Sequence, residues 1–418
     1  MQSNRGMLAL LKYPQFLKLW LARTVSRFGD SVDSIAFMWM IYQLTGSGAQ
    51  MGLIMAVNFL PNLIFGMLGG VIADRRSKKK TMLVGDIGRG AIVSVTALLY
   101  AAGVLKAWHL YVFTFLNSTL EAFASPARTS TMPLLVEDKA DILAANSLFS
   151  ASGSLAEIVG LGVAGTIIGY FGVAAAMLVD AATFFISAFS ISLTRIPRTG
   201  GQQASKMSWD GLRHDLGEGL SLAFGNKLIR LCIFMGFALN AFASPFSILA
   251  PLFSDQVLGA GAQGFGNMNM ALTSAMLLGS LLIGQFGRRF SDRQRIMAGF
   301  LGMGAGFLLV GASRTVWLAM AGSVCIGLGV SFLIGTMTTI VMTRCQPELL
   351  GRVSSVMNGT MMAAMPASSA LAGAMVQPLG TVRLITAIGI LVLLVGALTV
   401  SSPHLRPAEG AKVDADVA

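Results

Sequence analysis

Long apolar stretches alternate with short polar connections along almost the whole chain. A helix that crosses a bilayer needs about 20 mostly apolar residues. By this measure the pattern predicts twelve transmembrane helices, at residues 16–44, 49–73, 81–103, 107–132, 145–168, 172–194, 228–253, 264–287, 295–313, 315–341, 353–377 and 381–402. The expected fold class is therefore an all-α polytopic membrane protein.

Composition agrees with this pattern and excludes several classes of protein. The mean hydropathy is +0.71 and only 12% of residues are charged, whereas soluble proteins carry about 25%. The net charge of +11 does not indicate a nucleic-acid partner, because the cations are spread between apolar runs. The three Cys form no paired motif, so we expect neither a disulfide framework nor a thiolate metal site. No metal and no cofactor are expected. No nucleophile–base pair, HExxH or GxxxxGK motif suggests an enzyme.

The longest polar connection, at 195–227, divides the chain into two sets of six predicted helices. We expect an N-terminal bundle at 1–194, this linker, a C-terminal bundle at 228–403 and a tail at 404–418. Within the linker, apolar residues from Trp209 to Phe224 recur at helical spacing. That spacing predicts an amphipathic helix on the membrane surface.

The cations are distributed unequally between the two sides of the predicted membrane. Only Lys106, Arg314 and Arg383 fall in the connections on one side, and most of the others fall on the side that holds both termini. By the positive-inside rule this predicts a multi-pass protein of the inner (plasma) membrane with both termini cytoplasmic. The lipid bilayer is its expected surroundings.

The stretch "GGVIADRRSKKK" at 69–80 joins predicted helices two and three. It resembles the signature of the major facilitator superfamily in the same loop, with Ser77 in place of a glycine. The resemblance implies two pseudo-symmetric six-helix bundles around a central cavity. It also implies a gating role for Asp74, which would meet the start of helix eleven near Arg352. The matching positions that make up this gating motif are Gly70, Asp74, Arg75, Lys78 and Lys79. In the alternative interpretation, Asp74 is a solvated turn residue and the cations only orient the chain.

Further stretches resemble the macrolide and siderophore exporters of that superfamily. They are "SRFGDSVDSIAFMWMIYQLTGS", "FASPARTSTMPLLV", "AANSL", "VDAATFFISA" and "ELLGRVSS". This resemblance implies a monomeric drug:proton antiporter that exports an amphipathic organic compound, such as a macrolide-like drug or a siderophore. A lipid or lysolipid flippase of the same fold and a non-transporting membrane sensor are the alternatives.

Five acids lie near the middle of predicted helices, all in the first half of the chain. Each costs roughly 2.5–3.5 kcal/mol to insert, so such residues usually have a function. Asp30, Glu121 and Asp33 are the candidates for proton coupling, whereas Glu157 and Asp180 suggest a structural role. Alternatively, Asp30 only forms a helix-locking ion pair with Arg27, three residues earlier.

Other polar residues in the predicted helices form two candidate groups. An ion network near the inner membrane surface is expected from Arg27, Asp86, Arg89, Arg128 and Arg352. The residues expected to face the substrate are Asn117, Asn240, Ser244 and Ser247.

Overall fold

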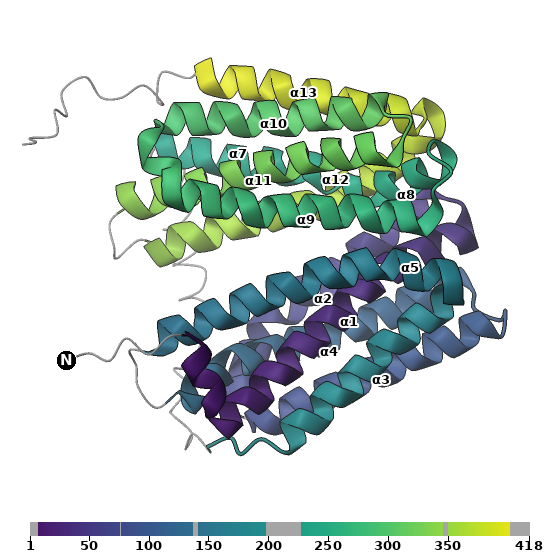
Figure 1. The fold of residues 1–418 in the computed structure, drawn as a ribbon, viewed down its shortest axis with the longest axis vertical. Coiled ribbons are helices and arrows are strands. Elements are labelled where there is room, and N and C mark those ends of the chain that lie inside the picture. The colour runs from purple at the N-terminus through teal and green to yellow at the C-terminus, as the bar shows by residue number, and fades with distance from the viewer. Residues whose placement is uncertain (1–6, 76, 137–140, 198–226, 346–349, 402–418) are drawn as a thin grey trace, which may run out of the picture.

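The computed structural model describes residues 7–75, 77–136, 141–197, 227–345 and 350–401. These residues form helices joined by turns, and no β-strand occurs among them. Figure 1 shows two groups of helices, one built from the chain before residue 197 and one from the chain after residue 227. The predicted all-α fold is therefore confirmed. The expected surface helix at 209–224 and the tail at 404–418 lie outside the described residues.

The first group holds a short 3-10 helix, η1, followed by five assigned α-helices. Their bounds are η1 Met7–Lys12, α1 Pro14–Thr45, α2 Gly48–Arg75, α3 Lys78–Ala101, α4 Ala107–Thr131 and α5 Asp141–Ser192, with the 3-10 helix η2 Met132–Leu135 after α4. At 52 residues and 1.5 Å per residue, α5 would measure about 78 Å if straight, more than twice the hydrocarbon thickness of a bilayer. Gly172 breaks it with a φ of 83°, which favours glycine. The parts on either side match the predicted helices 145–168 and 172–194.

The second group begins with α7 and ends with α13. The bounds are α7 Lys227–Ala243, α8 Phe246–Gln256, α9 Gly261–Phe286, η3 Gly287–Arg289, α10 Asp292–Ala312, α11 Val316–Arg344, α12 Leu350–Leu379 and α13 Thr381–Ser401. The single helix expected at 228–253 is divided into α7 and α8. Pro245 lies at the division, and it has no N–H to continue the helical hydrogen bonds.

Nine segments of the described chain are long and apolar enough to cross a membrane, when α5 is counted once. Helices α1 and α4 are not among them, and both carry several ionisable residues that bond inside the first group. The structure therefore supports a polytopic membrane protein. The number of twelve crossings stays a prediction.

The two groups pack closely at one end of the molecule, where glycines let their backbones approach. A Cβ added at Gly373 of α12 would lie 2.1 Å from the carbonyl oxygen of Gly48 of α2. On the other side of the same end, a Cβ at Gly165 of α5 would lie 2.6 Å from Cα of Gln263 of α9. In Figure 1 the ribbons of the two groups diverge toward the opposite end, where α1 begins. We call the packed end the closed end.

The interior of the two groups differs in charge. Large apolar side chains such as Phe253, Phe300 and Phe307 are fully buried in the second group. Among the described residues, the buried charged side chains are Asp86, Arg89 and Asp180, and all three lie in the first group. The ionisable side chains that could carry a function are therefore gathered between α1, α3, α4 and α5.

Candidate functional site

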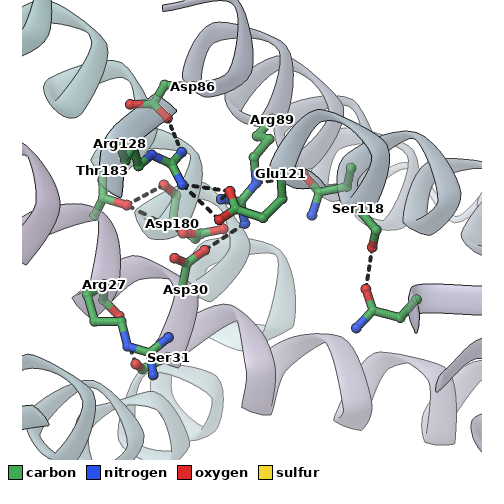
Figure 2. A network of polar contacts seen from close by, with 12 residues as sticks. Arg27, Asp30, Ser31, Asp86, Arg89, Ser118, Glu121, Arg128, Asp180 and Thr183 are labelled. Carbon is green, nitrogen blue, oxygen red and sulfur yellow. Dashed lines mark hydrogen bonds and ion pairs between the residues drawn. The ribbon is translucent and has the colours of Figure 1, made fainter. Parts of the chain in front are cut away.

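Arg89 of α3 joins three helices at the centre of the first group. Its Nη2 lies 2.7 Å from Oδ1 of Asp30 on α1, and its Nη1 lies 2.8 Å from Oε2 of Glu121 on α4. Its Nε donates a 3.2 Å hydrogen bond to Oδ1 of Asn117, also on α4. Figure 2 shows Asp30 and Glu121 converging on this one guanidinium. The two carboxylates are thus held close together by a shared cation.

Arg128 extends these contacts toward the end where α1 begins. Its Nη1 donates to both oxygens of Glu121, at 2.7 and 2.9 Å, and its Nη2 lies 2.5 Å from Asp86. Asp86 also accepts a 2.6 Å hydrogen bond from the hydroxyl of Ser187 on α5. We call Asp30, Asp86, Arg89, Glu121 and Arg128 the ion network. The expected grouping of Asp86, Arg89 and Arg128 is present in space.

Helical spacing and small residues explain why these side chains meet. Asp86 and Arg89 are three residues apart on α3, so they share one face. Gly85 sits beside Ala124, and a Cβ there would lie 2.7 Å from that of Ala124, so α3 and α4 pack closely. The Arg89 guanidinium also lies 4.2 Å from the ring centroid of Phe184, within cation–π range.

The helix-locking interpretation expects an ion pair between Arg27 and Asp30, but the structure does not show one. The Nη2 of Arg27 lies 2.6 Å from Oε2 of Glu157 on α5, and the two side chains are 50% and 30% exposed. Asp30 forms its ion pair with Arg89 instead. The expected Arg27–Asp30 pairing is therefore wrong, because helix packing brings Glu157 of α5 to Arg27 and Arg89 of α3 to Asp30.

Two cavities border Asp30, and the second also borders Arg89. The first measures about 440 Å³ and is lined by residues of α1, α4 and α5, among them Arg27, Glu121 and Glu157. The second measures about 230 Å³ and is lined chiefly by α1 to α4, including Asp33 and Asn117. Asp30 lines both. The ion network therefore borders two separate spaces.

Asp33 differs from the other acids on α1. Its Oδ1 is buried and has no hydrogen-bond partner, although the residue lines the second cavity. Asp33 therefore lies beside the ion network, and it forms no ion pair with any other residue that the structure describes.

The three substrate-facing candidates of the second half donate side-chain hydrogen bonds to backbone carbonyls three or four residues earlier. Asn240 donates to the carbonyl of Gly236 at 3.2 Å, Ser244 to that of Asn240 at 2.8 Å, and Ser247 to that of Ser244 at 2.8 Å. Neither of the two cavities described above is lined by them. Asn117 does line the second cavity, but its side chain is also bound to Arg89.

The gating motif is only partly described. The backbone of α2 includes Gly70, Asp74 and Arg75, but their side chains, and that of Arg352, lie outside the described residues, and so does the predicted contact between Asp74 and Arg352. Lys78 begins α3. The Nζ of Lys79 donates to the carbonyls of Ser192 and Thr194 at 2.6 and 2.8 Å. It thereby satisfies carbonyls at the end of α5.

The central position of Arg89 was not predicted from the sequence, because Arg89 was expected nearer the inner membrane surface. Its spacing from Asp86 indicated a shared face but could not identify the helices opposite. The pairing of Arg27 with Glu157, 130 residues apart, had no local signal. Within the described chain, no group of three His, Cys, Asp or Glu could hold a metal ion.

Two efflux proteins are similar to this chain in sequence along most of its length. Macrolide efflux protein A of Streptococcus pyogenes is 26% identical over 354 residues, which cover 84% of this chain and 87% of that protein. The multidrug efflux pump Tap of Mycolicibacterium fortuitum is 25% identical over 399 residues, covering 94% and 96%.

Solved structures of other transporters resemble this chain in fold, at a sequence identity too low to indicate more than the fold. The nucleoside transporter NupG has a TM-score of 0.74 at 14% identity and covers 92% of this chain and 97% of its own. A bacterial homologue of the human lysosomal transporter Spinster has a TM-score of 0.72 at 13% identity, covering 95% and 97%. The profile of the Major Facilitator Superfamily matches residues 19–370 and 246–414. This chain is therefore a membrane transporter that belongs to the Major Facilitator Superfamily.

Proposed function

We propose that the protein exports an amphipathic organic compound, such as a macrolide-like drug or a siderophore, in exchange for protons. The export direction is supported by relatives that are named macrolide and multidrug efflux pumps. With the orientation that the positive-inside rule predicts, the closed end faces outward. The described state would then take up substrate from the cytoplasm, with the monomer as the transporting unit.

The observation that carries proton coupling is the sharing of Arg89 by Asp30 and Glu121. The two carboxylates sit on α1 and α4, so they hold two helices through one cation. A proton that reaches this cluster weakens one of the two ion pairs, because a neutral acid attracts a guanidinium less than a carboxylate does. Protonation would therefore change how α1 and α4 are held together. Alternating access requires helices to move relative to one another, so this change could drive it.

The two cavities support a route for substrate and proton to the same cluster. The first cavity carries both signs of charge and many hydroxyl groups, including those of Ser26, Ser125 and Ser150. Such a lining suits the polar end of an amphipathic compound. Asp33 adds an acid on the opposite side of Asp30.

Reconstituted vesicles test the proposal. Asp30→Asn and Glu121→Gln should each reduce gradient-driven export at least tenfold and leave substrate exchange without a gradient largely intact. Melting temperatures should be recorded alongside, because each substitution also removes an ion pair to Arg89. Export by the wild type that survives complete collapse of the proton gradient, with sodium absent, would refute proton coupling. Movement of a fluorescent lysolipid but of no drug would favour the flippase.

A further inference from the structure

Asp180 is a buried acid that the proposed coupling scheme does not use. It lies in the stretch "VDAATFFISA" of α5 and is 1% exposed. The sequence suggests a structural role for it. A structural acid at such depth needs a cation or several hydrogen-bond donors.

The surroundings of Asp180 supply neither. Within the described part of the chain, its one side-chain hydrogen-bond partner is the Thr183 hydroxyl, 3.4 Å from Oδ1, and that hydroxyl lies 2.7 Å from the backbone carbonyl of Asp180. A hydroxyl has a single hydrogen, so the shorter bond takes it. Among the described residues, no Lys or Arg forms an ion pair with Asp180.

Close helix packing brings α1 directly against the Asp180 carboxyl group. A Cβ added at Gly29 of α1 would lie 2.5 Å from Oδ1 of Asp180 and 1.9 Å from the Thr183 hydroxyl. The glycine lets α1 cover the carboxyl group directly. Figure 2 shows Asp180 and Thr183 beside the ion network.

The charged groups that act on Asp180 are mainly negative. Asp33 and Asp30 of α1 interact with it electrostatically, and Arg89 of α3 is the cation that does so. Each nitrogen of that guanidinium already donates to Asn117, Glu121 or Asp30. Asp33 has a buried oxygen without a partner as well. Two neighbouring acids are therefore left without a counter-ion.

Asp86 provides a direct comparison inside the same bundle. It is 0% exposed, but it is bound by Arg128 at 2.5 Å and by Ser187 at 2.6 Å. Burial alone thus does not leave an acid unpaired in this protein. The difference lies in the partners.

We infer that Asp180, with Asp33 beside it, binds the proton that the transporter exchanges for its substrate, an inference that rests on the proposed function. The proton forms an O–H bond with one carboxylate oxygen, and the charge of the pair changes from two negative charges to one. Nothing is oxidised or reduced. The proton reaches Asp180 through Asp33, which lines the second cavity.

This assignment gives the ion network a defined part in coupling. While Asp180 is protonated, Arg89 stays with Asp30 and Glu121, as the structure has it. When Asp180 loses its proton, it competes for the guanidinium, which already packs against Phe184 of the same helix. Passage of the proton from Asp180 to Asp30 or Glu121 would then loosen the hold of Arg89 on α1 and α4, which is the same change that protonation of these two acids causes in the proposed function.

Infrared difference spectroscopy of the full-length protein in detergent tests the inference without any substrate. At neutral pH the wild type should show the C=O stretch of a protonated, buried carboxylic acid. Asp180→Asn should remove this band and should not lower the melting temperature, because it removes an unpaired acid. Asp86→Asn is the matched control, which should keep the band and lower the melting temperature.

Transport of ethidium into inverted vesicles supplies the second readout. Asp180→Asn should lose gradient-driven uptake at least tenfold and keep downhill exchange within about twofold of the wild type, a split that a purely structural residue would not produce. The inference is overturned if the band persists in Asp180→Asn, or if that variant folds and still pumps at the wild-type rate. Gradient-independent uptake by the wild type would instead count against the proposed function, while the infrared result would still decide where the proton binds.

Should Asp180→Asn fail to fold, Asp33→Asn replaces it. Removing the negative neighbour weakens the hold on the proton, so the infrared band should disappear at a lower pH than in the wild type. A band with an unchanged pH dependence would overturn the inference.

Discussion

The hydroxyl of Tyr42 donates a 2.7 Å hydrogen bond to Oδ2 of Asp255. It joins the end of α1 to the end of α8 across the two groups of helices, at the closed end of the molecule. The bond lies near the close approach of Gly48 and Gly373. Opening this end would have to break the polar contact and separate the glycine-lined surfaces.

Tyr42→Phe should therefore shift the population toward a state that is open at this end. An exposed hydrogen bond contributes roughly 0.5–1 kcal/mol, so the ratio of the two states should change by about two- to fivefold. Spin labels at Trp108→Cys and Trp317→Cys, both exposed and near the closed end, report the distance between the groups after the natural cysteines are replaced. Tyr100→Phe is the control, because Tyr100 bonds Gln43 within the first group. Equal distance distributions for the two variants would contradict the role of Tyr42.

Gly373→Ala should prevent the closed end from forming as described. The new Cβ would lie 2.1 Å from a backbone oxygen of Gly48, which cannot move aside as a flexible side chain would. We expect longer distances between the same spin labels and loss of at least nine-tenths of transport. Gly359→Ala is a matched control on the same helix, since nothing lies within 4 Å of its added Cβ. Wild-type transport by Gly373→Ala would contradict the packing of α2 on α12.

Arg89→Gln should destabilise the protein strongly. It leaves Asp30 and Glu121 without their shared cation, and breaking a buried ion pair costs about 3–5 kcal/mol. Arg27→Gln should cost no more than about 1 kcal/mol, because the Arg27–Glu157 pair is much more exposed than the pairs of Arg89. Thermal unfolding in detergent, followed by intrinsic fluorescence, compares the two. Similar losses of melting temperature in both variants would show that burial does not set the strength of these pairs.

Asp74→Asn should slow turnover more than it weakens substrate binding, because Asp74 belongs to the gating motif that joins the second and third predicted helices. Equilibrium binding in detergent and transport at saturating substrate measure the two effects separately. A variant that loses binding but keeps its turnover would rule out the gating role.

Much of the candidate site was predictable from local sequence, but its pairing was not. Asp30 and Glu121 could be identified because ionisable residues in apolar helices are rare. Arg128 and Asp86 could be grouped because both lie toward the same side of the predicted membrane, Asp86 toward the start of α3 and Arg128 near the end of α4. Asp180, in contrast, suggested only a structural role, since its lack of a partner depends on what α1 and α3 place beside it.

Hydrophobic length and the signature at 69–80 are properties of consecutive residues, so most of the helices, their order and the superfamily could be predicted from them. Which charges meet depends instead on how the helices pack. Arg27 is three residues from Asp30 but pairs with Glu157, and Arg89 bonds acids on two other helices. An ion pair forms where packed helices bring donor and acceptor within about 3 Å, and that choice depends on small residues such as Gly29 and Gly85 that set how closely the helices approach.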